Sequence, residues 1–413
     1  MKQRIRYGAI IIAILLAFSS CGETPAQNNS SDSLIIGGNI KMVESQNTAS
    51  PYSDGIFHDS RYYDVQFVSA QNCTYFSGLV ALSIDASPEA PKLICSDPLC
   101  AHKYSEGACV STAEFGYIAP IGDVLYLARG EKSTNKIYRY NTETLEYEMY
   151  AEFSNDVSRI FALGRYLYVQ ISHFELDENN NIAKSEAEYI RIDTSENTAT
   201  SLYKLPAREI YGDLCAYKGE FYYIEDSTLM TLDVALEPYE YITTGTSNLD
   251  NGCREFEIHN DKIYYLPSDE AHMYELWEYD MTTGKEIKLL DDVYRFTVLN
   301  GQVYTHKYRL QSAREFYDNK WQDDNTYEYD NEIVGYGLTD LYNGEPLVIC
   351  RILPPEGAYF GGTILRSGQG SLYSFLAPID HDPGNLSCHG EFRYHIEGDV
   401  WHQLMYDYIT PFQ

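Results

Sequence analysis

The fold is decided by a short pattern that reads most clearly as Arg159-Ile160-Phe161-Ala162-Leu163-Gly164, followed after two further residues by Leu167-Tyr168. An apolar run ends at a turn residue. Shortly after the turn comes a pair of residues, of which the first is usually apolar and the second is Tyr. The same step returns along the chain at Tyr75, Tyr126, Tyr168, Tyr222, Tyr264, Tyr304 and Tyr373. Successive tyrosines lie 51, 42, 54, 42, 40 and 69 residues apart, so the chain repeats itself with insertions of variable length.

A second pattern follows each of the first six copies, an alternating segment that ends in Asp or Asn. Its occurrences are Leu82–Asp85, Tyr138–Asn141, Ile190–Asp193, Met230–Asp233, Trp277–Asp280 and, more loosely, Tyr336–Asp340. Alternation with a period of two, closed by a turn-forming residue, predicts a strand and a hairpin. Four short strands in a repeat of about 50 residues are typical of a β-propeller blade.

We therefore predict an all-β fold, a β-propeller of seven four-stranded blades that spans residues 59–413. A propeller with six or eight blades is an alternative, as is a β-sandwich or a pair of smaller β domains. No sustained apolar period of 3.6 residues occurs after the N-terminal region, which argues against a helical fold.

The N-terminal residues predict export. Lys2, Arg4 and Arg6 precede an apolar or small stretch, Gly8 to Phe18, which is too short for a membrane-spanning helix of about 20 residues. The segment Leu16–Cys21 resembles a bacterial lipobox, which implies cleavage after residue 20 and a lipid on Cys21 that anchors the protein to the outside of the cell membrane. Ordinary secretion, with Cys21 left in the discarded peptide, is the alternative.

Composition separates the segment after Cys21 from the rest of the chain. Residues 21–58 are rich in Asn, Ser, Thr, Gln and Pro and predict a flexible tether, in which Leu34-Ile35-Ile36 is apolar enough to dock as a strand.

The whole chain of 413 residues is acidic, with 61 acidic and 30 basic residues and a net charge of -31. Its 39 Tyr suit pleated sheets. Such acidity argues against a nucleic-acid partner.

Three cysteines and one histidine gather after the first predicted blade. The residues are Cys95, Cys100, His102 and Cys109, in a Cys-x4-Cys-x-His-x6-Cys arrangement. Three thiolates and an imidazole suit a closed tetrahedral zinc site of the structural kind, the one cofactor that the sequence suggests. A disulfide among the three cysteines is the competing interpretation outside the cytoplasm, and buried free thiols are a third. Each would serve to hold a long loop.

The lipobox-like segment, this Cys/His loop and the blade rhythm together resemble a group of propeller-type surface lipoproteins from Gram-positive anaerobes. Members of that group carry a Cys-x-x-Pro-x-Cys-x-His…Cys loop directly after a blade strand, and Pro98 of this chain stands one place later than in that form. The resemblance implies a propeller held at the cell surface by lipid. It implies no established activity.

Aromatic and acidic residues alternate in one predicted insertion, between Glu315 and Glu332. The candidate binding-face residues there are Phe316, Tyr317, Trp321, Asp323, Asp324 and Tyr327. Rings that stack on sugar faces and carboxylates that accept hydroxyl protons suit a carbohydrate, and loops on a rigid scaffold often carry the binding function. The alternative is a solubilising surface loop.

The sequence lacks several common catalytic motifs. The sequence contains no Gly-x-Ser-x-Gly, His-Glu-x-x-His or Gly-x-x-x-x-Gly-Lys motif. We expect a lipid-anchored envelope protein that binds a protein, peptide or glycan without catalysis. A hydrolase or lyase acting on surface polysaccharide is the alternative, and an envelope assembly factor resembling quinoprotein-repeat lipoproteins is a third interpretation.

Overall fold

A computed structural model describes the chain in separate stretches, all of which belong to one compact unit, Ser33–Gln413. The described residues are 34–36, 40–42, 57–62, 65–70, 73–77, 82–85, 92–95, 97, 99, 115–129, 135–178, 182–206, 213–232, 238–241, 247–308, 330–342, 344–353, 358–368, 371–378, 390–395 and 400–403. They form 31 strands and one short 3₁₀ helix, Asn248–Asn251. None of the described helices is long and apolar enough to cross a membrane.

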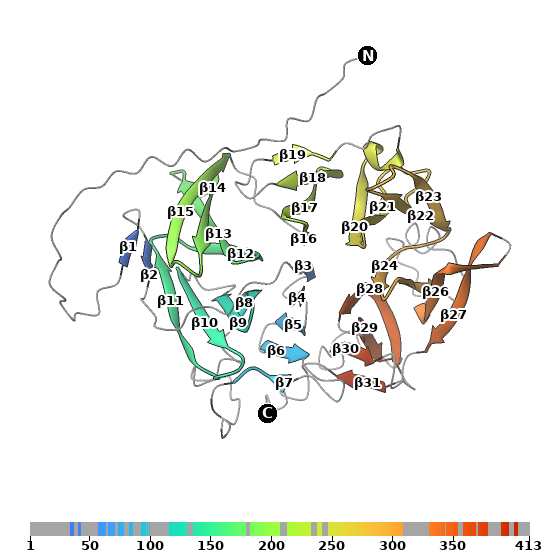
Figure 1. Ribbon diagram of the computed structural model, residues 1–413, viewed down its shortest axis with the longest axis horizontal. Coiled ribbons are helices and arrows are strands. Elements are labelled where there is room, and N and C mark those ends of the chain that lie inside the picture. Colours follow the sequence, from blue (N-terminus) through green and yellow to red (C-terminus); the bar gives the residue numbers. More distant parts are fainter. Residues whose placement is uncertain are drawn as a thin grey trace, which may run out of the picture. The chain divides into compact units, whose positions relative to one another are not determined.

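Most of the described strands form seven antiparallel meanders of four strands each (Figure 1). The first three are β4 (Val65–Ala70), β5 (Cys73–Ser77), β6 (Leu82–Asp85), β7 (Lys92–Leu93); β8 (Phe115–Ile121), β9 (Val124–Arg129), β10 (Lys136–Asn141), β11 (Tyr147–Phe153); and β12 (Val157–Leu163), β13 (Tyr166–Leu176), β14 (Ile182–Asp193), β15 (Thr198–Pro206).

The remaining four meanders follow in chain order. They are β16 (Leu214–Tyr217), β17 (Glu220–Glu225), β18 (Thr228–Leu232), β19 (Pro238–Glu240); β20 (Cys253–His259), β21 (Lys262–Pro267), β22 (Leu276–Asp280), β23 (Glu286–Leu290); β24 (Phe296–Leu299), β25 (Gln302–Tyr308), β26 (Asp330–Tyr342), β27 (Glu345–Ile352); and β28 (Ala358–Gly368), β29 (Ser371–Pro378), β30 (Gly390–His395), β31 (Val400–Gln403).

Each meander packs on the next, mostly through first strands, and the series closes on itself. β4 and β5 contact β8, β8 contacts β12, β16 contacts β20, β20 contacts β24, and β24 contacts β28. Between the third and fourth meanders, Phe221 packs edge-on against Phe161, with ring centroids 5.0 Å apart. β28 of the seventh meander then contacts β4 of the first. Seven meanders in a closed series form a β-propeller, as the sequence predicted.

The repeating tyrosines lie at one place in this architecture. All seven fall in the second strand of a meander, namely β5, β9, β13, β17, β21, β25 and β29. Tyr126, Tyr168 and Tyr304 are at most 1% exposed, because a second strand has sheet neighbours on both edges and a blade on both faces. The alternating segments that end in Asp or Asn form the third strands, as predicted.

The Asp or Asn that ends a third strand is required by the turn that follows. Asp280 Oδ1 accepts hydrogen bonds from the backbone N–H groups of Thr282 and Thr283, at 2.9 and 2.7 Å. Asn141 and Asp193 bind the equivalent amides of their own turns. These side chains satisfy backbone groups that the end of the strand leaves unpaired, which explains why the pattern recurs in the sequence.

Three strands precede the first meander. β1 (Leu34–Ile36) and β2 (Ile40–Met42) form a hairpin, and β2 pairs with β11, the outermost strand of the second meander. Both lie inside the range 21–58 that was predicted to be a tether, and β1 is the apolar segment expected to dock there. β3 (Phe57–Tyr62) pairs with both β4 and β16, the first strands of the first and fourth meanders.

Candidate functional site

Four successive meanders carry an ionisable residue at the same register position, either in the first strand or directly before it. The last residue pairs before the first hairpin turns are Leu163↔Tyr166, Tyr217↔Glu220, His259↔Lys262 and Leu299↔Gln302. Four residues before each pair stand Arg159, Asp213, Glu255 and Arg295, which we call the axial charge arc. First strands of a propeller surround its axis, so equivalent positions lie at the same level around that axis.

The backbone is irregular at this level. In the third meander the register of β12 and β13 shifts between Val157 and Arg159, and in the fifth that of β20 and β21 shifts between Cys253 and Glu255. A β-bulge turns the bulged side chain away from the regular face of the sheet. The unpaired residues at these shifts are Ser158 and Arg254, so a bulge lies directly before Arg159 and before Glu255 of the arc.

A short ion pair lies at one end of the arc, between the fifth and sixth meanders. Arg295 Nη1 is 2.9 Å from Glu255 Oε2, and the two side chains are 28% and 3% exposed. The carboxylate of Glu255 raises the pKa of Arg295, and the charge of Asp213 acts in the same direction. Glu255 and Arg159 are each 4% exposed, whereas Asp213 is half-buried. The arc thus combines deeply buried charges with a carboxylate and a guanidinium that solvent still reaches.

A second carboxylate joins the same two strands. Glu257 Oε1 accepts a hydrogen bond from Thr297 Oγ1 and Oε2 accepts one from the backbone N–H of Val298, both at 2.8 Å. His259 Nε2 lies 3.0 Å from the same Oε2. Glu257 therefore satisfies the backbone of the neighbouring first strand and holds β20 and β24 at a fixed spacing.

Arg254 links the fifth meander to the loop before the sixth. Its Nε and Nη2 atoms donate to the carbonyl oxygens of Met273 and Tyr294, at 2.9 and 3.0 Å. The guanidinium also lies 5.6 Å from the ring centre of Tyr274 and 5.7 Å from that of Tyr294. Burial lowers the pKa of Arg254. These contacts fix the segment that leads into Arg295.

A buried histidine lies beside the arc on β25. His306 is fully buried, and its Nε2 atom is 3.2 Å from Ser374 Oγ on β29 of the seventh meander. Burial, assisted by the charge of Arg295, lowers the pKa of His306 to about 3. At neutral pH the ring is uncharged, so it serves as a neutral polar bridge between two blades.

β3 occupies the axial side of two first strands. Its register against β16 is Leu214↔Asp59, Cys215↔His58 and Ala216↔Phe57. Leu214 directly follows Asp213 of the arc, so the backbone of β3 runs beside one member of the arc. The strand that enters the propeller from the N-terminal side thereby closes part of the surface that first strands normally present to the axis.

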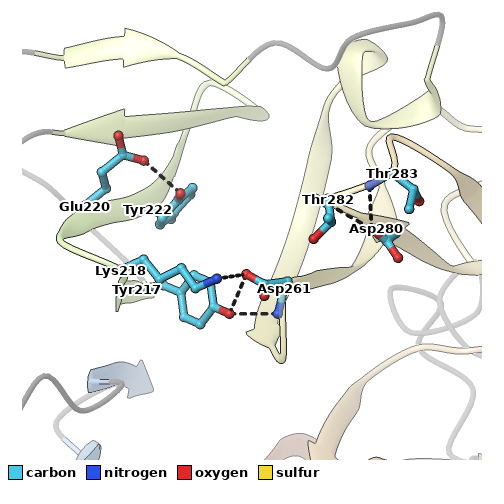
Figure 2. Close-up of polar contacts among 8 residues, drawn as sticks. All are labelled: Tyr217, Lys218, Glu220, Tyr222, Asp261, Asp280, Thr282 and Thr283. Carbon is cyan, nitrogen blue, oxygen red and sulfur yellow. Dashed lines mark hydrogen bonds and ion pairs between the residues drawn. The ribbon is translucent and has the colours of Figure 1, made fainter. Parts of the chain in front are cut away.

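A different charge cluster lies at the opposite ends of two of these strands (Figure 2). Lys218, in the first turn of the fourth meander, forms an ion pair with Asp261 in the first turn of the fifth. Tyr217 Oη donates to Asp261 Oδ1 at 2.9 Å and accepts from the Asp261 N–H at 2.7 Å. The contacts from Lys218 and Tyr217 lower the pKa of Asp261. The cluster joins adjacent hairpin turns at the surface.

Of the Cys/His loop, only Cys95 is among the described residues. Its Sγ lies 3.4 Å from both the amide nitrogen and the carbonyl oxygen of Asp97. Cys100, His102 and Cys109 lie outside the described residues, as do Cys21 and the candidates Phe316, Tyr317, Trp321, Asp323, Asp324 and Tyr327. Lipidation, the zinc or disulfide site and the aromatic binding face therefore stay predictions.

Buried thiols do occur elsewhere. Cys215 and Cys253, on the first strands of the fourth and fifth meanders, belong to one apolar cluster and are 2% and 0% exposed. Burial raises the pKa of the Cys253 thiol to about 12 and also raises that of Cys215. A thiol with a raised pKa is a poor nucleophile, so these two residues act as apolar core.

No protein-family model and no curated protein matches the chain. Among solved structures, it is similar to an acylaminoacyl peptidase bound to Z-Gly-Gly-Phe-chloromethyl ketone, with 13% identity, a TM-score of 0.43 and coverage of 86% of this chain and 52% of that one. The chain therefore spans about half the length of that peptidase.

Two further similar structures are a protein from Lactobacillus plantarum and a dihydro-heme d1 dehydrogenase. The first has 11% identity, a TM-score of 0.37 and coverage of 86% of this chain and 96% of that one. The second has 9% identity, a TM-score of 0.37 and coverage of 92% and 81%. The assignment of the propeller fold rests on the strand pairing and the closed series of contacts described above.

Proposed function

We propose that this chain is a lipid-anchored protein of the cell envelope whose propeller binds a partner without catalysis, and that the axial charge arc is where it binds. The recurrence of an ionisable residue at one register position of four neighbouring meanders carries the proposal. The partner that fits best is a basic polypeptide segment.

The energetics of burial support a binding role for the arc. Replacing a buried ion pair with well-packed apolar residues is often neutral or stabilising, so stability alone gives little reason to keep charges there. The neighbouring cores show that this fold readily places apolar residues on first strands, for example Ile160 and Phe256. Charges that recur at a fixed level are better explained by recognition.

Electrostatics indicate the sign of the partner. The whole chain has a net charge of -31, and removing residues 1–20 would make it -34, because that segment contains three basic and no acidic residues. A strongly negative protein attracts cationic partners over distances of about a Debye length. Within the arc, the carboxylate of Asp213 is half-buried, so it keeps a negative charge within reach of solvent and of a cationic side chain.

The engaged state of the carboxylates favours binding over hydrolysis. Glu255 is ion-paired with Arg295, and both oxygens of Glu257 accept hydrogen bonds from β24. A carboxylic acid that protonates a leaving group has to be free to contact it, whereas these two side chains are held by groups of the protein. These two glutamates are therefore poor general acids.

Binding at the arc is tested with a ten-residue oligolysine peptide, titrated calorimetrically into the full chain at 50 and 150 mM salt. We expect Asp213→Asn to weaken binding about tenfold, the effect of losing one charge-assisted hydrogen bond of about 1.4 kcal/mol. Glu143→Gln, in an exposed turn, removes the same charge elsewhere and should change the affinity less than twofold. Equal losses in the two variants, or no binding to the wild type, would refute the proposal.

Lipid anchoring is tested separately. We expect the wild-type chain to fractionate with membranes and the Cys21→Ala variant to appear as soluble protein or unprocessed precursor. Metabolic labelling with an alkyne fatty acid should mark the wild type alone. A Cys21→Ala variant that is labelled and membrane-bound like the wild type would show that residue 21 is not the lipidation site.

A further inference from the structure

The outermost strand of the sixth meander exposes apolar side chains. In β27, Leu347, Val348 and Ile349 are 45%, 40% and 36% exposed. Among the described strands, β27 pairs with β26 alone, so its outer edge has no strand partner there. An exposed apolar edge strand is an open template for pairing with another chain, and soluble proteins usually protect such an edge.

The sequence of β27 is complementary to itself when reversed. It reads Glu345-Pro346-Leu347-Val348-Ile349-Cys350-Arg351. The pairing of β27 with β26 is bulged at Ile349, since Cys350 pairs with Gly335 and Val348 pairs with Tyr336. In an antiparallel pair centred on Val348, Glu345 lies opposite Arg351, and Leu347 lies opposite the bulged Ile349. Each of these pairs occurs twice because of the two-fold symmetry. Opposite charges and apolar pairs that face each other across a ladder stabilise it.

We propose that β27 pairs with β27 of a second copy of this chain, antiparallel and in register about Val348, to form a symmetric dimer. The interface is isologous, with the same strand contributed by both subunits, as in most homodimers. The exposed ends of the strand supply the charge complementarity: Glu345 and Arg351 are both exposed, and Arg351 would be shared between Glu332 of its own subunit and Glu345 of the other.

The molecule already contains an added strand at an equivalent place. β2 pairs with the outer edge of β11 in the second meander, with Ala151↔Met42, Glu152↔Lys41 and Phe153↔Ile40 in register. An outer edge of a blade in this fold therefore accepts an antiparallel strand. In the second meander the chain supplies that strand itself, and in the sixth we assign the role to the second copy.

Apolar residues beside β27 extend the surface. Ile287 of β23 is 52% exposed and Leu353, just after β27, is 63% exposed. β23 contacts β27, and Leu353 directly follows the last residue of β27, so both residues belong to elements next to this strand. Pro346 has no N–H group and removes one donor from each strand, which keeps the ladder short. We expect a dimer with a dissociation constant in roughly the micromolar range, as for small interfaces.

The first test measures the mass of the full chain by sedimentation equilibrium at 150 mM salt, between about 1 and 200 µM. We expect a concentration-dependent dimer. Glu345→Arg should weaken it at least tenfold, since two pairs become repulsive, and Glu345→Arg with Arg351→Glu together should restore it. A wild type that stays monomeric, or a dimer that Val348→Lys leaves intact, would overturn the proposal.

Arg351 also forms an ion pair with Glu332 of β26 in its own subunit. Glu332→Gln removes that contact without changing the edge and should leave the dimer affinity within about twofold. Thermal unfolding of every variant shows whether the blade is folded. A double reversal that is folded but monomeric would contradict the register.

A second test reads the register directly. Across an antiparallel pair, opposite Cβ atoms are about 4.5–5.5 Å apart, within reach of a disulfide after a small adjustment. We expect Val348→Cys to form a covalent dimer on mild oxidation, more than the unmodified chain does. Leu353→Cys, five residues from the symmetry axis, should not. Equal cross-linking of the two variants would refute pairing about Val348.

Discussion

Inner strands of the propeller bury charged residues, whereas one outer strand exposes apolar residues. On the first strands of the third and fifth meanders, the axial charge arc buries Arg159 and Glu255 almost completely. On β27, the outermost strand of the sixth meander, Leu347 and Val348 are exposed. Both regions depart from the usual distribution of polar and apolar residues, and such departures are expected where a protein binds something.

The two regions differ in whether their side chains and strand edges have partners within the described part of the chain. The arc is satisfied within the chain, since Glu255 holds Arg295 and Glu257 holds the next strand. β27 has only one described strand neighbour. Mutations in the arc should therefore cost stability, whereas exposed positions of β27 should tolerate substitution and affect association instead.

The largest effect is expected from Glu255→Gln. It leaves the mostly buried guanidinium of Arg295 without its charge partner, which should lower the free energy of unfolding by about 3 kcal/mol. Val348→Thr, on exposed β27, should change it by less than about 0.5 kcal/mol in dilute protein. Urea denaturation of both variants checks the contrast. Equal effects would remove the distinction between the two regions.

The next effect concerns His306 and pH. Its folded pKa of about 3 lies below the unfolded value of about 6.5, so between these values the unfolded chain binds a proton that the folded chain does not. The free energy of unfolding should therefore fall as the pH is lowered, by about 1.4 kcal/mol per unit at most, or about 2 kcal/mol between pH 6.5 and 5.

His306→Gln removes this titration. We expect the variant to lose less stability than the wild type over the same pH range, when both are measured by denaturant unfolding at each pH. An unchanged slope in His306→Gln would show that the residue is protonated in the folded protein.

A smaller effect tests where β27 does pack. A Cβ atom on Gly335 of β26 would lie 2.6 Å from Cys350 Sγ and 2.8 Å from Tyr304 Cε1. Gly335→Ala should therefore destabilise the sixth meander by about 1–2 kcal/mol through overpacking. Gly335→Ala together with Cys350→Ala relieves the closer contact and should recover part of the loss. A neutral Gly335→Ala would show that β26 and β27 are farther apart.

The smallest effect is a gain in stability at a surface turn. Leu145 has φ 62°, a conformation that is unfavourable for a bulky side chain, whereas Asn197 and Gly284 hold the equivalent places of other third-strand turns. Leu145→Gly should raise the midpoint of thermal unfolding by relieving about 1 kcal/mol of strain. Thr144→Gly, one residue earlier, is the control and should not stabilise.

The sequence revealed the parts of the fold that have a local cause. An Asp or Asn recurs at the end of third strands because its side chain, like that of Asp280, binds the amides of the turn that follows. A Tyr recurs in second strands because such a strand, like the one that contains Tyr126, is enclosed on both faces. These requirements repeat in every blade with the same residue types. They suffice to predict seven four-stranded units from the chain alone.

The axial charge arc has no recurring pattern of this kind in the sequence. Its members are Arg, Asp, Glu and Arg, unlike residues with no common neighbours in sequence, and their equivalence appears only when the hairpin registers are aligned. β27 was hidden for the opposite reason. Leu347-Val348-Ile349 reads as an ordinary buried strand, and its exposure follows from its place at the outer edge of a blade.

The axial charge arc requires that equivalent positions of neighbouring meanders lie close together in space. Glu255 and Arg295 do so, although they are 40 residues apart in the chain. A double-mutant cycle with Glu255→Gln and Arg295→Gln measures that contact directly in the free energy of unfolding. We predict a coupling of at least about 1 kcal/mol, as for contacting charged groups. Additive effects of the two substitutions would contradict the arrangement of the arc.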